Sequence, residues 1–335
     1  MERSILDELA VKARARSALD AFLFAPATAR PLAVLRIGLA LVLLVQAATL
    51  RPEIVDWFSR DGLFQGFGSA SGASGASFGP RVHDLLAGLS SLGLDEGSGI
   101  RALGAAYVVA LALLAVGLCT RLAALLAWFL HWTFMLSADP LGYGVDRYAH
   151  IFLFYLIWVP AGRAISLDEM LFRPSSASAS AARFGLRVMQ IHMAISYLAS
   201  GLEKASGIDW WDGELLFRAL SFPDCKQFEM SWLASYPAIA QLACLGTLAV
   251  ELGYCVFIWP QRTRRLWLAA ILSLHVGIAV FLGLHFFGAI MFVLNFALFG
   301  VSAEPRPDQA AFFAGAEGGA SSTLTQPGMR RSNAL

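Results

Sequence analysis

Long runs of apolar residues, separated by short polar segments, make up most of the chain. A helix that crosses the hydrocarbon core of a bilayer needs roughly 20 consecutive, mostly apolar residues. The pattern predicts about eight such helices, and for the fourth and fifth, which are shorter or more polar, a re-entrant helix is an alternative. The predicted spans are residues 31–50, 101–118, 121–138, 147–162, 185–203, 238–259, 265–283 and 285–302.

Composition indicates a lipid environment for these helices. Hydrophobic residues make up 57% of the 335 residues and charged residues only 15%, whereas soluble domains carry about 25% charged residues. Side chains that face lipid have to be apolar, and each backbone polar group has to be satisfied within its own helix. We therefore expect an all-α, polytopic transmembrane helix bundle in the lipid bilayer, without a sizeable soluble domain. The net charge of +1 gives no reason to expect a nucleic-acid partner.

Three segments of the chain differ in composition. Residues 1–27 are charged and mixed, which is typical of an amphipathic helix at the membrane surface, and they lack the apolar core of a cleavable signal peptide. Residues 28–302 hold all the predicted spans. Residues 303–335 are rich in Ala, Gly, Ser and Thr, so a disordered tail is expected there.

Basic residues in the connecting segments predict how the spans are oriented. With eight spans, the segments on the side of the N-terminus carry the higher density of Lys and Arg, as cytoplasmic segments do. We therefore expect a multi-pass protein of the cell (plasma or inner) membrane with both termini in the cytoplasm. The basic residues assigned to that side are Lys12, Arg14, Arg16, Arg30, Arg121, Arg163, Arg173, Arg183, Arg187, Arg262, Arg264 and Arg265.

Several ionisable residues fall within predicted spans, where a charge costs roughly 2.5–3.5 kcal/mol on insertion scales, and three of them are the most informative. Arg36 either snorkels to the lipid head groups or locks helix packing through an ion pair. Glu251 lies in mid-span and is either a structural hydrogen-bond partner or a proton relay. His275 is either a packing hydrogen bond or a ligand-binding residue. No metal site is expected, because neither the histidines nor the four cysteines have the spacing of metal ligands.

The densest set of candidate residues lies at the end of the fifth predicted span. Tyr197, Gly201 and Lys204 are spaced i, i+4 and i+7, which places them on one helical face. Gly201 permits the close approach of another helix or of a flat ligand. Lys204 lies where the apolar run ends, followed by Trp210 and Trp211. Its amine is either an interfacial anchor or a partly desolvated base that is neutral at ordinary pH.

A second cluster of polar residues surrounds the fourth predicted span. Asp146 and Arg147 precede its apolar run, and Asp168 follows it. Asp168 comes two residues after Ser166 and before a short apolar stretch, which is the pattern of a helix cap.

Several segments of the chain, taken together and in order, resemble a known family. They read LRIGLALVLL followed by DWFSRDGLF, then GVDRYAHIFLFYLIWVPAGRAISLD, IHMAISYLASGLEKASGIDWWDG, AVELGYCVFI and SLHVGIAVFLGLHFF. This order resembles the horizontally transferred transmembrane (HTTM) domain family, whose best-known relatives are the vitamin K-dependent γ-carboxylases. The resemblance covers roughly residues 28–300. Its most specific pieces are the Tyr–x(3)–Gly–x(2)–Lys–x(5)–Trp run and the Ser–Leu–Asp ending.

The resemblance implies a chemistry for Lys204, which falls on the position of the carboxylase's active-site lysine. That lysine is proposed to deprotonate vitamin K hydroquinone, whose oxygenation yields a strong base that removes a γ-proton from glutamate before carbon dioxide adds. This chain departs from the family at two positions. Glu203 stands where the family has a second basic residue, and Asp146 stands where the carboxylase has an important histidine. The large C-terminal domain that holds the carboxylase's protein substrate has no counterpart here, so carboxylation of a tethered protein is not expected.

Two functions of different classes remain open. The first is a γ-carboxylase-like membrane enzyme, a lyase or quinone-oxidising enzyme, that takes a reduced quinone of the vitamin K type or another lipid-like molecule. The second is a non-catalytic membrane scaffold or a partner subunit of a separately encoded redox protein. A proton or solute carrier is the weakest alternative, because no inverted repeat is recognisable. For the enzyme, the predicted catalytic residues are Lys204, Asp146 and His275, and the predicted substrate-binding residues are Tyr197, Gly201, Trp210, Trp211 and Glu251.

Overall fold

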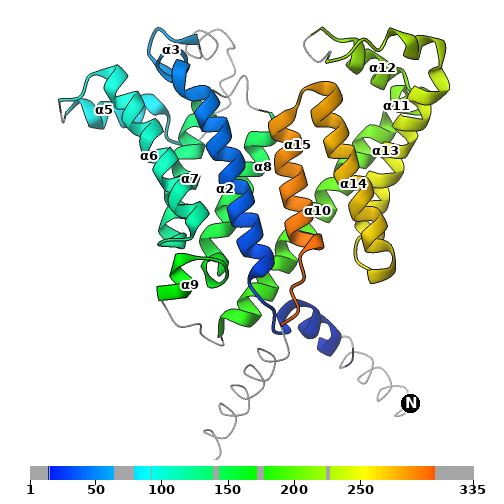
Figure 1. Ribbon diagram of the computed structural model, residues 1–335, viewed down its shortest axis with the longest axis horizontal. Coiled ribbons are helices and arrows are strands. Elements are labelled where there is room, and N and C mark those ends of the chain that lie inside the picture. Colours follow the sequence, from blue (N-terminus) through cyan, green and yellow to red (C-terminus); the bar gives the residue numbers. More distant parts are fainter. Residues whose placement is uncertain are drawn as a thin grey trace, which may run out of the picture.

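The computed structural model describes residue 14 and residues 16–63, 79–91, 93–138, 143–171, 177–223 and 227–305. Every regular element within these ranges is a helix, which confirms the all-α prediction. The long helices run beside one another between two ends of the bundle (Figure 1). Most of the predicted interfacial helix and most of the predicted disordered tail lie outside the described residues.

Each predicted apolar run is helical over most of its length. α8 ends at Trp158, two residues before Pro160, because proline cannot continue a helix ladder. The long helices are α2 (Arg30–Leu50), α6 (Glu96–Val116), α7 (Thr120–Ser137), α8 (Gly144–Trp158), α10 (Ala177–Ser206), α13 (Pro237–Phe257), α14 (Gln261–Leu282) and α15 (His285–Asn295), which η5 (Phe296–Gly300) continues.

Four helical segments in the described part of the chain are long and apolar enough to cross a membrane. They are Arg30–Phe58, Glu96–Val116, Pro237–Phe257 and Gln261–Leu282. Large apolar side chains on these segments, such as Leu41, Leu242 and Leu266, face outward, as contact with lipid requires. The helices therefore suit a lipid bilayer. α7, α8 and α10 do not meet the same criterion of length and hydropathy, so a total of about eight crossings stays a prediction.

Short helices lie at both ends of the bundle (Figure 1). One end, called the α9 end below, also carries the α6–α7 and α13–α14 turns and the helix of residues 16–24. The opposite end is called the α3 end. The short elements of the α9 end are η3 (Ala161–Arg163) and α9 (Leu167–Leu171), and those of the α3 end are η1 (Arg51–Glu53), α3 (Ile54–Phe58), α5 (Val82–Ser90), α11 (Asp209–Asp212), α12 (Glu214–Ser221) and η4 (Ser231–Ser235).

The packing of the bundle is organised around α2. This helix contacts α6 and α15 along its length and η3 and η5 near its start. Leu32, Leu35, Leu39 and Leu43 recur every three or four residues and are at most 1% exposed, so they form one buried face.

Arg36 lies on this buried face of α2 and is 0% exposed, so it does not snorkel. Its Nη1 donates hydrogen bonds to the carbonyl oxygens of Leu114 (2.6 Å) and Ala115 (3.1 Å), and its Nη2 donates to that of Ile165 (2.6 Å). Leu114 and Ala115 belong to the last turn of α6, whose carbonyls lack partners within the helix. Arg36 therefore locks packing through backbone carbonyls rather than through the ion pair that the sequence suggested.

Asp168 binds the other side of the same turn. Its carboxylate accepts hydrogen bonds from the backbone N–H groups of Cys119 and Thr120 (2.8 Å each) and from the Thr120 hydroxyl (2.7 Å). These groups begin α7, so Asp168 is a helix cap, as its sequence context indicated, but for a helix far away in the chain. Ser166 caps the local helix α9 by accepting a hydrogen bond from the Glu169 N–H (2.9 Å).

Gly117 joins α6 to α7 between these two side chains. Its φ of 72° lies in the left-handed region, which glycine adopts without a steric penalty. A Cβ atom at this position would clash with the guanidinium of Arg36 and with Ser166. The Gly117 carbonyl also accepts a hydrogen bond from the Asp168 N–H (2.9 Å).

The helix of residues 16–24 packs against the bundle at the α9 end. Arg187 of α10 donates a hydrogen bond from Nε to the Phe22 carbonyl oxygen (3.1 Å) and lies 4.1 Å above the Phe22 ring. The chain that follows pairs with the end of the bundle, because the Thr28 N–H donates to the Ala303 carbonyl oxygen (2.9 Å).

The last helix of the bundle ends as a π-helix, η5. In a π-helix the hydrogen bonds span five residues instead of four, so the turn is wider. Gln190 of α10 donates a hydrogen bond from Nε2 to the carbonyl oxygen of Leu298 in this wide turn (2.6 Å).

Replacing Arg36 by Leu is expected to lower the midpoint of thermal unfolding in detergent. The change leaves the carbonyls of α6 without donors, and each hydrogen bond to a charged group contributes about 1.5–3 kcal/mol. Arg121→Gln is the matched control, because Arg121 is exposed at the same end of the bundle. Equal midpoints for the two variants would contradict the role given to Arg36.

The Asp168 cap is expected to make stability depend on pH. Burial alone would raise the pKa of this carboxyl, but hydrogen bonds from Thr120 and Cys119 and the charge of Arg36 outweigh it, so the pKa is lowered in the folded protein. A lowered pKa stabilises the fold above the ordinary range of Asp, about 3.9, and this contribution is lost as pH falls through the folded value. The difference in unfolding midpoint between the unaltered protein and Asp168→Asn should therefore be largest near pH 7 and shrink below about pH 4. A difference that stays constant with pH would rule out the ionised cap.

Candidate functional site

One face of α10 carries the polar side chains that the sequence singled out. Tyr197 and Lys204 point from this face toward α13, α14 and α15. The partners of these side chains are Glu251 on α13 and His275 on α14, which the sequence also predicted, and Asn295 on α15, which it did not. Lys204 lies at the α3 end of α10, and Tyr197 lies two turns deeper in the bundle.

Lys204 forms an ion pair inside the bundle. Its Nζ lies 2.8 Å from Glu251 Oε2 and also donates a hydrogen bond to the Ser200 hydroxyl. The Lys204 side chain is 23% exposed and that of Glu251 is 7% exposed, so the pair joins a partly exposed side chain to a buried one. The ring of Trp210 lies beside the amine, with its centroid 5.5 Å from Nζ. Lys204 is therefore held against α13 and does not extend into water.

Deeper in the bundle, four side chains from four helices form one hydrogen-bonded network. The Tyr254 hydroxyl donates to Asn295 Oδ1, Asn295 Nδ2 donates to the Tyr197 hydroxyl oxygen, and the Tyr197 hydroxyl lies against His275 Nε2, each at 2.7 Å. All four residues are at most 3% exposed. Asn295 Nδ2 also donates to the Met291 carbonyl oxygen (2.7 Å), which fixes the orientation of the amide. Tyr197, Tyr254, His275 and Asn295 are called the buried network below.

The buried network leaves one polar group unsatisfied. Because Asn295 donates to the Tyr197 oxygen, the Tyr197 proton is available for His275 Nε2, and the ring proton of His275 then lies on Nδ1. This Nδ1 is buried and has no hydrogen-bond partner among the described residues. An unsatisfied buried donor is uncommon and destabilising by about 1–3 kcal/mol.

Gly201 serves helix packing in this arrangement. A Cβ atom there would lie 2.8 Å from Leu252 Cδ2 and 3.2 Å from the Leu252 backbone nitrogen. Of the two alternatives for this glycine, the space beside it is filled by α13 rather than left for a flat ligand.

Two other predicted site residues lie apart from the ion pair. Trp211 is 51% exposed and donates its indole N–H to the Ala205 carbonyl oxygen (2.9 Å). Asp146 lies at the start of α8, where its carboxylate accepts hydrogen bonds from the Tyr143 N–H and from Gln46 Nε2 (3.4 Å each). Asp146 lines a separate cavity, and neither Lys204 nor His275 borders that cavity.

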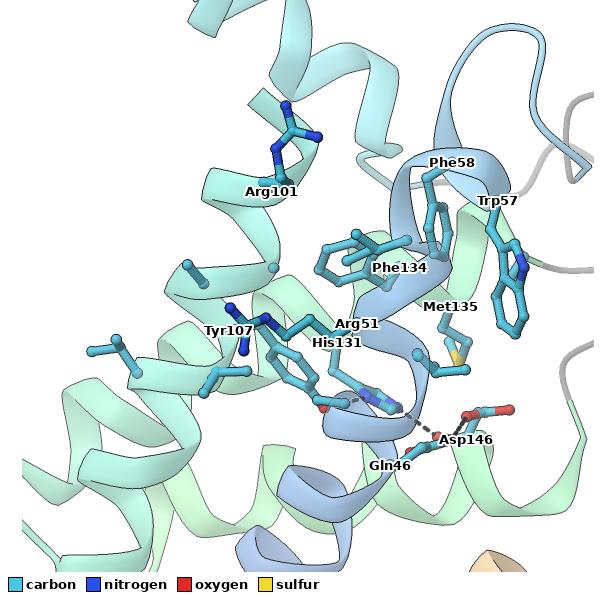
Figure 2. Close-up of a pocket in the computed structure, with 18 of the residues that line it drawn as sticks. Gln46, Arg51, Trp57, Phe58, Arg101, Tyr107, His131, Phe134, Met135 and Asp146 are labelled. Atoms are coloured by element: carbon cyan, nitrogen blue, oxygen red, sulfur yellow. Dashed lines mark hydrogen bonds between the residues drawn. The ribbon is translucent and has the colours of Figure 1, made fainter. Parts of the chain in front are cut away.

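This cavity, called the α6 cavity below, lies between α2, α3, α6 and α7 and encloses about 660 Å³ (Figure 2). Its walls are mostly apolar, and one side carries Tyr107 and His131, joined by a hydrogen bond of 3.0 Å. No pattern in the sequence indicates this cavity, because residues from distant segments form it. Its polar lining residues are Gln46, Arg51, Arg101, Tyr107, His131, Tyr143 and Asp146.

Three carboxylates at the α3 end, those of Asp209, Asp212 and Glu214, lie within 4.8 Å of one another. Arg218 pairs with Asp209 and Glu214, so this exposed cluster is already neutralised in part by a side chain. The cluster is a solvated feature of α11 and α12 rather than a built site.

Comparison with known proteins gives one match. Residues 94–302 match the family model of the HTTM domain, the domain shared with vitamin K-dependent γ-carboxylase. The match extends from just before α6 to just after η5 and includes the ion pair and the buried network. No curated protein and no solved structure matches the chain.

The ion pair makes a prediction about stability that does not depend on function. Lys204→Met and Glu251→Leu should each destabilise the protein, by up to about 3–5 kcal/mol, because each leaves an uncompensated charge in the bundle. The double variant should be more stable than the sum of the two single effects predicts, which a double-mutant cycle of unfolding midpoints measures. The exposed Arg218–Glu214 pair is the control, and its coupling should be within about 1 kcal/mol of zero. Additive effects at Lys204 and Glu251 would show that the pair is not formed.

Proposed function

The chain belongs to the HTTM domain family, and on this basis we propose that it is a multi-pass membrane enzyme that removes a proton from a lipid-soluble hydroquinone at the Lys204–Glu251 pair. One observation carries the proposal: the Lys204 side chain is partly exposed, while the side chain of its partner Glu251, 2.8 Å away, is buried. Such an arrangement suits the transfer of a proton from a substrate into the protein.

In the proposed step, the pair first exchanges its own proton. When the substrate binds, the Lys204 ammonium gives a proton to the Glu251 carboxylate across their hydrogen bond. The neutral amine then takes the proton of a hydroquinone hydroxyl, whose O–H bond breaks and leaves both electrons on the oxygen. The resulting phenolate pairs with the Lys204 ammonium, so the net charge of the site does not change.

The surroundings of Lys204 favour an aromatic, lipid-soluble substrate. The Trp210 ring lies next to the amine and offers a flat face on which a quinol ring can stack. The amine lies near the end of α10, at the α3 end of the bundle.

The buried network takes a positioning role in this proposal. Tyr197 lies on the same face of α10 as Lys204, and its bonds to His275 and Asn295 hold α10 against α14 and α15. This contact fixes the rotation of α10 about its axis and hence the direction of the Lys204 side chain. Asp146, which the sequence grouped with the catalytic residues, belongs to the α6 cavity and has no part in the step.

The proposal includes an orientation in the membrane. All eight long helices cross the bilayer, and the α9 end faces the cytoplasm. Its support is the positive charge at that end, where Arg121, Arg163, Arg264 and Arg265 lie in or beside the turns. The Lys204–Glu251 pair then faces the opposite side of the membrane.

Lys204→Arg is the variant that tests the enzyme. Arginine keeps the positive charge and the ion pair with Glu251 but does not give up its proton in proteins. With a reduced vitamin K-type quinone in liposomes, the unaltered protein should consume oxygen and release quinone and hydrogen peroxide. Lys204→Arg should lower this rate by about 10²–10⁴-fold, the usual contribution of a catalytic base.

Arg218→Lys is the matched control, because it alters an exposed cation at the same end of the bundle and should leave the rate unchanged. The unfolding midpoints of all proteins are compared to confirm that they fold. An unchanged rate in Lys204→Arg would exclude the amine as the base. A folded but inactive unaltered protein would favour the alternative, a non-catalytic partner of a redox protein.

A further inference from the structure

We infer that the α6 cavity binds an amphiphile with a hydrocarbon tail and an anionic head group. This site is separate from the proposed hydroquinone site, and the inference does not depend on it. It rests on the size and apolar walls of the cavity, on the hydrogen bonds already made at its polar side, and on two arginines in its lining.

The cavity has the dimensions and walls of a ligand site. Its volume of about 660 Å³ lies within the roughly 300–1,000 Å³ that small-molecule pockets usually have. The walls come from α2, η1, α3, α6, α7 and the start of α8, so the space is part of the bundle and not a gap beside a loop (Figure 2). The apolar lining includes Ala47, Leu50, Ile54, Ala105, Val108 and Phe134.

The polar side of the cavity offers little to a ligand that needs hydrogen bonds. His131 Nε2 lies 3.1 Å from the Asp146 carbonyl oxygen, which only accepts, so this nitrogen carries the ring proton. Nδ1 therefore accepts the proton of the Tyr107 hydroxyl. The ring N–H of His131 and the Tyr107 proton are thus both used within the protein. A hydrocarbon tail fits beside these two side chains better than a polar group that would need a donor from them.

Arg51 and Arg101 supply positive charge in the cavity lining. Both are exposed, and within the described residues neither has a carboxylate at ion-pair distance; the charge of Asp95 acts on Arg101 only from farther away. Arg218, another arginine of the α3 end, differs because Asp209 and Glu214 pair with it. Guanidinium groups bind carboxylates and phosphates through paired hydrogen bonds, so these two suit an anionic head group.

Asp146 fixes the side on which the head group binds. Its carboxylate lies across the cavity from Arg101, and Gln46 bonds to it there (Figure 2). An anion is repelled from that side and attracted to Arg51 and Arg101. The head group therefore lies toward α6 at the α3 end, and the tail extends along the apolar wall.

Two kinds of molecule share this chemistry, a free fatty acid and an anionic phospholipid of the bilayer. The test measures the binding of oleate, phosphatidylglycerol and phosphatidylcholine to the purified, detergent-solubilised full chain by native mass spectrometry. We expect one of the two anionic molecules to bind at least about tenfold more tightly than phosphatidylcholine, because arginine forms paired, charge-assisted hydrogen bonds with an anionic head group. Tighter binding of oleate would identify the bound molecule as a fatty acid, and tighter binding of phosphatidylglycerol would identify it as a phospholipid.

Three variants connect this binding to the cavity. Arg51→Gln removes a cation and Ala105→Leu fills part of the apolar wall, and each should weaken binding about tenfold or more. Arg147→Gln changes an exposed arginine outside the cavity lining and should have no effect. Lys204→Arg should also have no effect, which separates this site from the proposed enzyme site. Unfolding midpoints confirm that each variant folds.

Equal binding of the anionic and zwitterionic lipids would overturn the inference. Full binding by a folded Ala105→Leu variant would overturn it as well, because the molecule would then lie elsewhere on the protein.

Discussion

The fold depends on how the ends of α6 and α7 are satisfied where two long apolar helices meet in a tight turn. The last carbonyls of α6 and the first N–H groups of α7 have no partners within their own helices, and a protein that faces lipid has little water with which to satisfy them. Arg36 donates to the carbonyls, and Asp168 accepts from the N–H groups. The charges match the helix ends, because the C-terminus of a helix attracts cations and the N-terminus attracts anions. The α6–α7 turn therefore holds together α2, α6, α7 and α9.

The helices were largely predictable from the sequence, and their side-chain partners were not. A long apolar run predicts a helix that faces lipid, and every predicted span is indeed helical over most of its length. Spacing along one helix also placed Tyr197 and Lys204 on one face, as observed. The partner of Lys204 lies 47 residues away, and no local rule connects the two positions. Arg36 shows the same limit: its burial follows from its helix face, but its three acceptors are carbonyl groups, which carry no side-chain signature in the sequence.

Two groups of polar side chains in the interior lie in separate parts of the bundle. The ion pair and the buried network join α10, α13, α14 and α15. The α6 cavity joins α2, α3, α6 and α7, and its apolar walls are interrupted only by side chains that already bond to one another or lie near its edge. Asp146 belongs to the second region, although its place in the sequence grouped it with the first. Because of this division, the proposed proton-transfer site and the proposed lipid-binding site share no residues.

The π-helical segment η5 determines how the chain leaves the bundle. A hydrogen-bonded turn of this kind holds one residue more than an α-helical turn, and each residue of a helix advances the chain by about 100°. Everything after Gly300 is therefore rotated by about that angle from the direction that a continuous α-helix would give. The rotated exit brings the Ala303 carbonyl to the Thr28 N–H, so the two ends of the membrane domain meet. Removing a single residue from Phe296–Gly300 would therefore undo this rotation and turn the Ala303 carbonyl away from the Thr28 N–H.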